Sequence, residues 1–361
     1  MKQLAVIAIT TLALMSCSTK KDKPLADVRP VVDTVGFAHL DWQTDSVIVR
    51  NEETYASELL KVGMDSTTAW RLAICPHDDY TYVGWLYPAL LKNIKAKTVI
   101  IFGVAHKAKH FNLADKLVFD SYPAWHGPYG NINPSPLREE IMKALPNNTY
   151  LVHDSLQTVE HSVESMLPFL QHYNPNVEIV SILVPYMSFS RMQEIAQPLA
   201  EAINQSMKKH NLKWGKDVAL LITTDAVHYG DEDWGGKNYA PYGTDSLGYQ
   251  KAVAHEHVII DSSLTGTLTT ERAQRFFDYT VDPTDYHEYR WTWCGRYSVP
   301  MGLLTALQLQ QLTGEAKLNG ELIGYANSID HKPLPVKDLR MGSTAIANLH
   351  HWVGYAAIGY R

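Results

Sequence analysis

The sequence predicts an α/β fold, a three-layer sandwich with a central, mostly parallel sheet. Short apolar runs, partly β-branched and closed by Gly, Pro or Asp, alternate with longer amphipathic stretches along the chain. This alternation is typical of parallel strands joined by covering helices. Of the 361 residues, 45% are hydrophobic and 19% are charged, which is enough for a large core. No linker, repeat or low-complexity stretch divides the bulk of the chain, so we expect a single domain over residues 36–361.

The order of the expected elements follows from that alternation. Apolar runs predict strands over residues 72–75, 98–102, 116–119, 177–184 and 218–223. The stretches between and after them predict helices over residues 84–94, 135–145, 190–210, 247–261, 270–279 and 299–312. A further helix is expected from Glu160, because four apolar residues form a stripe at helical spacing, namely Val163, Met166, Leu167 and Leu170. Short β-like segments from Leu318 onward are expected to extend the edge of the sheet.

The N-terminus predicts the compartment. Lys2 precedes an apolar run over residues 4–15, which is too short to span a bilayer comfortably, and the run closes on Cys17 in a Leu-Met-Ser-Cys box. This pattern resembles a bacterial lipoprotein signal peptide over residues 1–17, in which Cys17 carries the lipid. Residues 18–35 then form a polar tether. We expect a membrane-anchored lipoprotein outside the cytoplasm, on the periplasmic or cell-surface side; the alternative is an ordinary secretory signal with an incidental cysteine.

The charge of the chain bears on its partners, and its cysteines bear on disulfide formation and on the candidate site. The formal net charge is -6, and no basic cluster occurs beyond residues 20–23, which argues against nucleic acid as a partner. If Cys17 is acylated, Cys75 and Cys294 remain, and they can pair in an oxidising compartment. Cys75 lies inside an expected strand and is interpreted as a small buried residue. Of the two cysteines, Cys294 is the better candidate for a functional residue. Trp291 and Trp293 are expected to pack around its turn.

Three apolar runs far apart in the chain each end with a histidine, namely His77, His106 and His228. Open α/β sheets collect their ligands at the carboxyl ends of strands, so we expect these histidines to converge. Cys294 lies in a polar turn before an apolar helix, and Asp225 precedes His228. Two imidazoles, one thiolate and an Asp/His pair are what a transition metal with an open coordination position uses.

Five short motifs resemble those of one known family. Residues 76–84 (Pro-His-Asp-Asp-Tyr-Thr-Tyr-Val-Gly) resemble its Pro-His-Ala-Gly-Tyr-x-Tyr-Ser-Gly, and residues 103–106 (Gly-Val-Ala-His) resemble its Gly-Pro-Ser-His. Residues 160–170 (Glu-His-Ser-Val-Glu-Ser-Met-Leu-Pro-Phe-Leu) are similar to its Glu-His-Ser-x-Glu-x-Gln-Leu-Pro-Phe-Leu. Residues 224–228 (Thr-Asp-Ala-Val-His) are similar to its Ser-Asp-x-x-His, and residues 294–296 to its Cys-Gly-Arg. The order and spacing resemble the Memo-like family, also called AmmeMemoRadiSam system protein B, from about residue 69 to the C-terminus.

The resemblance implies a fold shared with class III extradiol ring-cleaving dioxygenases and a bound transition metal. Iron or copper is the implied metal, and zinc is the alternative. His77, His106 and Cys294 become the ligands, with the cysteine in the place of the dioxygenase carboxylate. His228 becomes the counterpart of the dioxygenase acid/base histidine, and Asp225 a pocket group beside it. The chemistry of the two side chains makes His228 and Asp225 the catalytic candidates, because His228 can move protons near neutral pH if Asp225 orients its ring.

Other motif residues are implied to surround the metal as pocket or supporting groups, namely Glu160, His161, Asp78, Asp79 and Tyr80. The sequence departs from the family at two of them, because Asp78 and Asp79 stand where the family has Ala-Gly. This substitution adds negative charge beside a ligand. Lys107 also follows His106 where the family usually has another histidine.

Each of these residues also has a structural interpretation. A histidine after a strand often only hydrogen-bonds a loop, which is the alternative for His77 and His106. For Asp225 and His228 the alternative is a pair that ties down a loop. Glu160 and the histidine after it are alternatively a helix cap and a helix-dipole partner.

Three function classes remain open. The first is a metal-dependent, dioxygenase-like oxidoreductase that acts on a small molecule, the second a metal-binding or redox protein without turnover, and the third a metal-dependent hydrolase. The expected partners are a small-molecule substrate or a metal, together with the lipid anchor. A thiolate ligand changes the charge and softness that tune iron for O2, so ordinary extradiol chemistry does not follow from the ligand set.

Overall fold

The computed structural model describes residues 28–62, 69–231 and 237–361. The expected signal peptide and Cys17 therefore lie outside the described residues, as does the first part of the expected tether. Of that tether, the described part packs against the domain, and Arg29 is 1% exposed.

The described strands form one eleven-stranded sheet in the order β5-β3-β6-β2-β7-β1-β11-β10-β9, with β4 beside β6 and β8 beside β11. Strands β6, β2, β7 and β1 are parallel to one another. Strand β3 is antiparallel to β6, and β11, β10 and β9 add antiparallel strands beyond β1. The strand bounds are β1 Leu72–Cys75, β2 Thr98–Val104, β3 Leu117–Phe119, β4 Asn133–Pro134, β5 Tyr150–Val152, β6 Glu178–Val184, β7 Val218–Thr223, β8 His228–Gly230, β9 Gly266–Thr267, β10 Asn319–Asn327 and β11 His351–Tyr360.

Helices connect most of these strands. The α-helices are α1 Asp41–Thr54, α2 Ala56–Val62, α3 Tyr80–Val83, α4 Leu86–Leu91, α5 Leu137–Ala144, α6 Asp154–Val159, α7 Leu167–Tyr173, α8 Phe189–Lys209, α9 Ser246–Ile259, α10 Thr270–Thr280 and α11 Ser298–Thr313. Short 3-10 helices are η1 Ala108–Phe111, η2 Glu164–Met166 and η4 Lys337–Leu339, and a π-helical turn, η3 Ile260–Leu264, continues α9.

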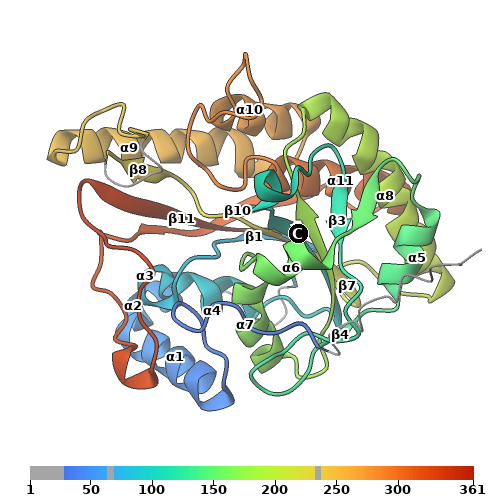
Figure 1. Cartoon of the computed structure of the whole chain (residues 1–361), viewed down its shortest axis with the longest axis horizontal. Coiled ribbons are helices and arrows are strands. Elements are labelled where there is room, and N and C mark those ends of the chain that lie inside the picture. Colours follow the sequence, from blue (N-terminus) through green and yellow to red (C-terminus); the bar gives the residue numbers. More distant parts are fainter. Residues whose placement is uncertain (1–27, 63–68, 232–236) are drawn as a thin grey trace, which may run out of the picture.

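The sheet separates two apolar cores, which gives the three layers. Along β1, Leu72 and Ile74 belong to one core, whereas Ala73 and Cys75 belong to the other, as expected for side chains that alternate across a strand. Helices α5, α8, α10 and α11 cover the first face, and α1, α4 and α7 cover the second (Figure 1). The predicted fold class is confirmed.

Two predicted helices differ from the structure. The helix expected over residues 84–94 is shorter, as α4 Leu86–Leu91, and a separate helix, α3, precedes it; Gly84 between them has a φ of +57°, which is unfavourable for other residues. The helix expected from Glu160 begins only at Glu164, as a 3-10 turn that leads into α7. Glu160 keeps an extended backbone, because its side chain reaches back to the loop after β2, and Pro168 suits the first turn of α7.

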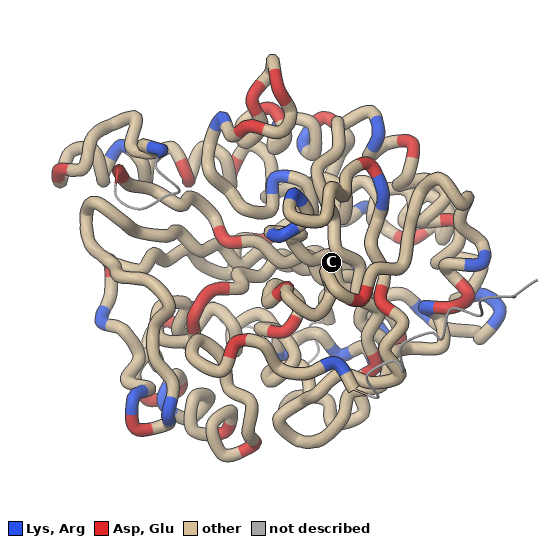
Figure 2. Tube along the Cα trace, in the orientation of Figure 1, with Lys and Arg blue, Asp and Glu red and all other residues tan. Residues whose placement is uncertain are grey.

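Charged residues lie mainly on the outer helices and loops, where acidic and basic positions are interspersed, and the central strands carry few of them (Figure 2). Within the part of the chain that the structure describes, no helix combines the length and the hydrophobicity needed to cross a bilayer.

Candidate metal centre

The carboxyl ends of three neighbouring parallel strands bring the predicted residues together. Cys75 at the end of β1 is in register with Thr223 at the end of β7, and β2 pairs with β7 on the other side. His77 and Asp225 each follow their strand by two residues, so the two loops meet above the same edge of the sheet. The backbone N–H of His77 donates to Asp225 Oδ1 over 2.8 Å, which joins the loops directly.

His77 is fully buried and its ring is oriented from both sides. Nδ1 lies 3.1 Å from Thr223 Oγ1. Nε2 lies 3.4 Å from Cys294 Sγ and 3.5 Å from Asp225 Oδ2. In a histidine that ligates a metal, one ring nitrogen usually forms a hydrogen bond and the other faces the metal and its further ligands. The His77 ring has this arrangement, because its Nε2 faces a thiol and a carboxyl group.

Cys294 reaches this edge from the loop before α11. Its Sγ accepts from the backbone N–H of Asp225 over 3.1 Å, and the N–H of Gly295 donates to Thr224 Oγ1 over 2.9 Å. A Cβ atom at Gly295 would lie 2.2 Å from Thr224 Oγ1, so only glycine allows this close approach. The Cys-Gly sequence of the motif is therefore explained by the contact between this loop and the end of β7.

The donor atoms of His77, Asp225 and Cys294 all lie within 4.8 Å of one another, and all three residues are buried. In a tetrahedral site with metal–nitrogen and metal–oxygen distances of about 2.1 Å and a metal–sulfur distance of about 2.3 Å, neighbouring donors are about 3.4 to 3.6 Å apart. The two distances measured from His77 Nε2 match these edges. A thiolate beside an imidazole and a carboxylate suits a transition ion rather than Mg²⁺ or Ca²⁺.

A second group of donors shares His77. His77, His106 and His161 also place ring nitrogens within 4.8 Å of one another. The rings of His106 and His161 are stacked with centroids 4.8 Å apart. The ligand set predicted from the sequence, His77, His106 and Cys294, is thus divided between two groups that meet at His77. His161, expected only as a pocket residue, lies where it can donate a ligand atom.

Glu160 supports His106. Its carboxylate is buried, with Oε2 2.9 Å from His106 Nδ1, and Oε1 accepts from the N–H of Lys107 over 2.6 Å. Such a carboxylate–histidine contact fixes a ring and leaves Nε2 as the free ligand atom. The segment comes this close because a Cβ at Gly103 would lie 2.7 Å from Val163, so glycine is needed in β2.

His228 lies beside Asp225. The distance from His228 Nε2 to Asp225 Oδ2 is 3.9 Å, which exceeds hydrogen-bonding range. Burial and the nearby His106 and His351 lower the pKa of His228 to about 3, so the ring is neutral at neutral pH.

Burial also sets the protonation of the donors themselves. Burial, reinforced by His106, holds the pKa of His77 well below its ordinary value. Burial, with the help of Asp225, raises the pKa of the Cys294 thiol, and burial together with Asp78 raises the pKa of Asp225. At neutral pH the imidazole lone pair is available, whereas the thiol retains its proton. Ligation by Cys294 must therefore release a proton.

The two aspartates that depart from the family motif have defined partners. Asp78 Oδ2 accepts from the hydroxyl of Tyr355 over 2.7 Å, and Asp79 accepts from the backbone N–H and hydroxyl of Thr344. Burial raises the pKa of Asp78, and burial together with Asp78 raises the pKa of Asp79 to about 7. The negative charge expected beside His77 is thereby reduced.

The remaining motif residues connect segments of the domain. The buried Tyr80 hydroxyl donates to the carbonyl of Ser165 over 2.7 Å. Arg296 of the Cys-Gly-Arg motif stacks on Tyr289, with its guanidinium carbon 3.4 Å from the ring centroid, and donates to the carbonyl of His287. Arg296 therefore holds the loop that precedes Cys294 against the start of α11.

Sequence reasoning missed the N-terminal segment next to the site. Arg29 forms a buried ion pair with Glu164 and donates from Nη2 to the carbonyl of Glu160 over 2.5 Å. The ring of Phe37 lies against His161, with centroids 6.1 Å apart. Residues 28–37 carry no local signal for these contacts, since the bond from Arg29 to Glu160 spans 131 residues.

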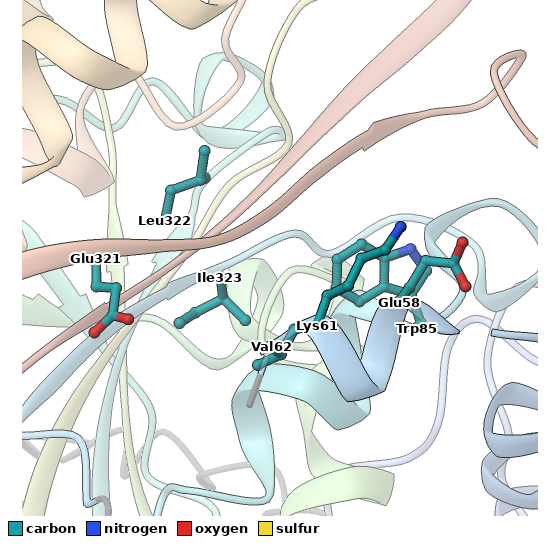
Figure 3. A pocket seen from close by; sticks show the side chains of 7 residues that line it. All are labelled: Glu58, Lys61, Val62, Trp85, Glu321, Leu322 and Ile323. Atoms are coloured by element: carbon teal, nitrogen blue, oxygen red, sulfur yellow. The ribbon is translucent and has the colours of Figure 1, made fainter. Parts of the chain in front are cut away.

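A surface pocket of 330 Å³ lies elsewhere, between α2 and β10. Figure 3 shows the side chains that line it, which are Glu58, Lys61, Val62, Trp85, Glu321, Leu322 and Ile323. It contains none of the residues of either donor group, so it is separate from the candidate metal centre.

Comparison with known proteins agrees with this arrangement. A MEMO1 family protein of Thermococcus kodakarensis is 24% identical over 329 residues, covering 89% of this chain and 96% of that protein. MEMO1 family proteins of Pyrobaculum aerophilum and Pyrobaculum arsenaticum are 26% and 30% identical over 166 and 164 residues. Those two matches cover 44% and 43% of this chain and 54% and 52% of the relatives, so the chain spans about half the length of each.

The fold, a large and mostly parallel sheet between helices, is consistent with that of Memo-like proteins and class III extradiol dioxygenases. The Memo-like protein family matches residues 50–336, which include every donor from His77 to Cys294. This chain belongs to the Memo-like family.

Proposed function

We propose that this Memo-like protein binds one transition ion, iron or copper in preference to zinc, through His77 and Cys294. Asp225 or the adjacent His106 and His161 complete the set of ligands. The observation that carries the proposal is the position of His77 Nε2, 3.4 Å from a buried thiol and 3.5 Å from a buried carboxylate. Burial favours the protonated forms of these two acidic groups, and a transition ion bound here would replace their protons.

A thiolate with imidazoles suits Fe(II), Cu(I) and Zn(II). The preference for iron or copper rests on the resemblance to the Memo-like family. A bound ion at such a site polarises a substrate or activates O2 or water. Hydrolysis with zinc would need activity in the absence of O2, which separates it from oxidoreductase chemistry.

A dioxygenase-like oxidoreductase that acts on a small molecule is the second candidate, and His228 favours it. Its ring is neutral at neutral pH, and its Nε2 lies 3.9 Å from Oδ2 of Asp225, one of the potential ligands. A neutral imidazole in this place can accept a proton from a bound substrate. A protein that only binds or buffers metal has no use for such a group.

The test is metal analysis of the full-length protein after anaerobic purification, followed by measurement of O2 consumption with a panel of catechols. One equivalent of iron or copper supports the metal centre. Consumption of O2 with a catechol supports the oxidoreductase, whereas its absence together with bound metal supports a metal-binding or redox role. Protein that takes up no transition ion under these conditions contradicts the proposal.

A further inference from the structure

Glu256 is a fully buried acid on a helix that is otherwise largely exposed. The buried positions of α9 are Gly248, Ala252, Glu256 and Ile259, which follow one stripe of the helix. An acidic residue in the middle of such a stripe is unfavourable unless its carboxylate is fully hydrogen-bonded. Its partners therefore show what the residue does.

Three N–H groups donate to the Glu256 carboxylate. Oε1 accepts from the indole Nε1 of Trp291 over 2.6 Å and from that of Trp293 over 2.7 Å. Oε2 accepts from the backbone N–H of Val227 over 3.0 Å. All three partners are donors, so the geometry selects an acceptor with two oxygens at this position.

These donors belong to the two loops that bear the metal-site residues. Val227 lies between Asp225 and His228, and Trp293 immediately precedes Cys294. The loops also pair with each other, through an antiparallel bridge between Val227 and Trp293. Glu256 thus joins the two loops through residues that are adjacent in sequence to the potential metal ligands.

The same loops meet at the donor atoms. The N–H of Asp225 donates to Cys294 Sγ over 3.1 Å, and the N–H of His228 donates to the carbonyl of Thr292 over 3.1 Å. A displacement of either loop by a few tenths of an ångström would change the distance from Sγ to His77 Nε2. The position of the thiol therefore depends on the contacts that hold the two loops together.

We propose that Glu256 is a positioning residue of the metal centre, which sets the place of Cys294 relative to His77 and Asp225 by holding both loops. This inference rests on the proposed metal-binding function. Glu256 donates no ligand atom itself, because both of its oxygens are occupied by N–H donors. Removal of such supporting partners typically weakens metal binding 10- to 100-fold.

The experiment is an anaerobic titration of the full-length chain with Co(II), followed by absorption spectroscopy. Wild-type protein should bind one equivalent and show the charge-transfer absorption of a thiolate ligand, which Cys294→Ser should lack. Glu256→Gln should bind Co(II) at least 10-fold more weakly and show a shifted charge-transfer and ligand-field spectrum. The amide retains the shape of the side chain but places an NH2 group against one of the N–H donors.

Asp120→Asn is the matched control. Asp120 is also buried, and it accepts from the indole Nε1 of Trp125 over 2.5 Å and from Arg138 over 3.0 Å, but its loop bears no donor of the metal centre. This variant should lower the melting temperature of the protein and leave the affinity for Co(II) and the spectrum unchanged. A general loss of stability is thereby separated from an effect on the metal site.

Trp293→Phe supplies an independent route to the same conclusion. It removes one donor to Glu256 and should weaken Co(II) binding in the same direction, and the double variant with Glu256→Gln should be less than additive. If Glu256→Gln fails to fold, Trp293→Phe decides: wild-type affinity and spectrum would overturn the proposal.

The two proposals fail in different ways. If Cys294→Ser binds Co(II) with the affinity and spectrum of the wild type, the metal centre is absent and both proposals are overturned. If wild-type protein shows the thiolate absorption and Glu256→Gln retains its affinity and spectrum, only the role of Glu256 is overturned.

Discussion

His77 is the residue on which the candidate site depends most, because both groups of donors include it. It owes this position to burial at the end of β1, where Thr223 fixes one nitrogen and the other faces a thiol and a carboxylate. Its low pKa keeps the ring uncharged, so protons do not compete for Nε2 until the solution is well below neutral.

As a metal ligand, Cys294 would make the proposed metal binding dependent on pH. Its pKa is raised by burial and by Asp225, so at neutral pH the thiol carries a proton that an incoming ion must displace. Affinity for the ion should therefore rise with pH between 6 and 8, by about tenfold per pH unit for each proton released. Calorimetry in buffers of different ionisation enthalpy would measure the released protons. An affinity that is constant over this range would contradict the assignment of Cys294 as a ligand.

A substitution of His228 distinguishes an enzyme from a protein that only binds metal. Because its pKa is lowered to about 3, the neutral ring is a proton acceptor at neutral pH. If a substrate is found, His228→Ala should retain the metal and the fold and lose about 100-fold or more in turnover. Turnover at the wild-type rate would exclude the acid/base role, and loss of the metal would show that His228 is a ligand.

At the scale of elements, the long buried strands were predictable, whereas the short strands β4, β5, β8 and β9 and the loops that complete the site were not. The apolar runs over residues 98–102 and 218–223 could be recognised as strands from the sequence, because a strand buried on both faces is a nearly continuous hydrophobic run. The conformation of the segment around Glu160 could not be recognised from its hydrophobic pattern. Its apolar stripe resembles a helix, but its conformation is decided by contacts with His106 and Lys107, which lie more than 50 residues earlier.

The sequence also predicted only part of the candidate site. Histidines and a cysteine after strands could be named from motifs, but their grouping could not, since it depends on loop geometry. Thus His161 was expected beside the site and lies among the ligand-capable residues. Glu256 was missed altogether, although an acid on the buried stripe of α9 was a usable signal.

The described part of the N-terminal segment, residues 28–40, acts as a structural element. Arg29 is buried, pairs with Glu164 and donates to the carbonyl of Glu160. Arg29→Ala leaves a buried carboxylate uncompensated, and its free energy of unfolding should fall by about 3 to 5 kcal/mol in urea titrations.

Arg50→Ala is the control for that change. Arg50 forms an ion pair with Asp338 at the surface, where solvent screens the interaction, so this variant should be little altered. If Arg29→Ala costs no more stability than Arg50→Ala, the N-terminal segment does not brace the site.

At the scale of the whole molecule, both flanks of the family match contribute to the centre. Arg29 and Phe37 precede residue 50, and Thr344 and Tyr355 follow residue 336. They contact His161, the carbonyl of Glu160 and the two aspartates after His77. The Asp-Asp sequence, which departs from the family motif, is thus matched by partners in the C-terminal flank.

We also propose that the protein is anchored to a membrane through Cys17, outside the cytoplasm. The lipobox and the polar sequence after it support this proposal. The wild-type protein should fractionate with membranes, and Cys17→Ala should be released or remain unprocessed. A Cys17→Ala protein that is processed normally and stays with the membranes would refute the anchor.

The central claim is that one ion is held through His77 and Cys294. The most direct measurement is the metal content and affinity of the His77→Ala, Cys294→Ala double variant, with His126→Ala as a control at an exposed histidine outside both donor groups. The double variant should lose affinity by orders of magnitude, whereas His126→Ala should bind one equivalent as the wild type does. Stoichiometric binding that survives the double change would contradict the assignment.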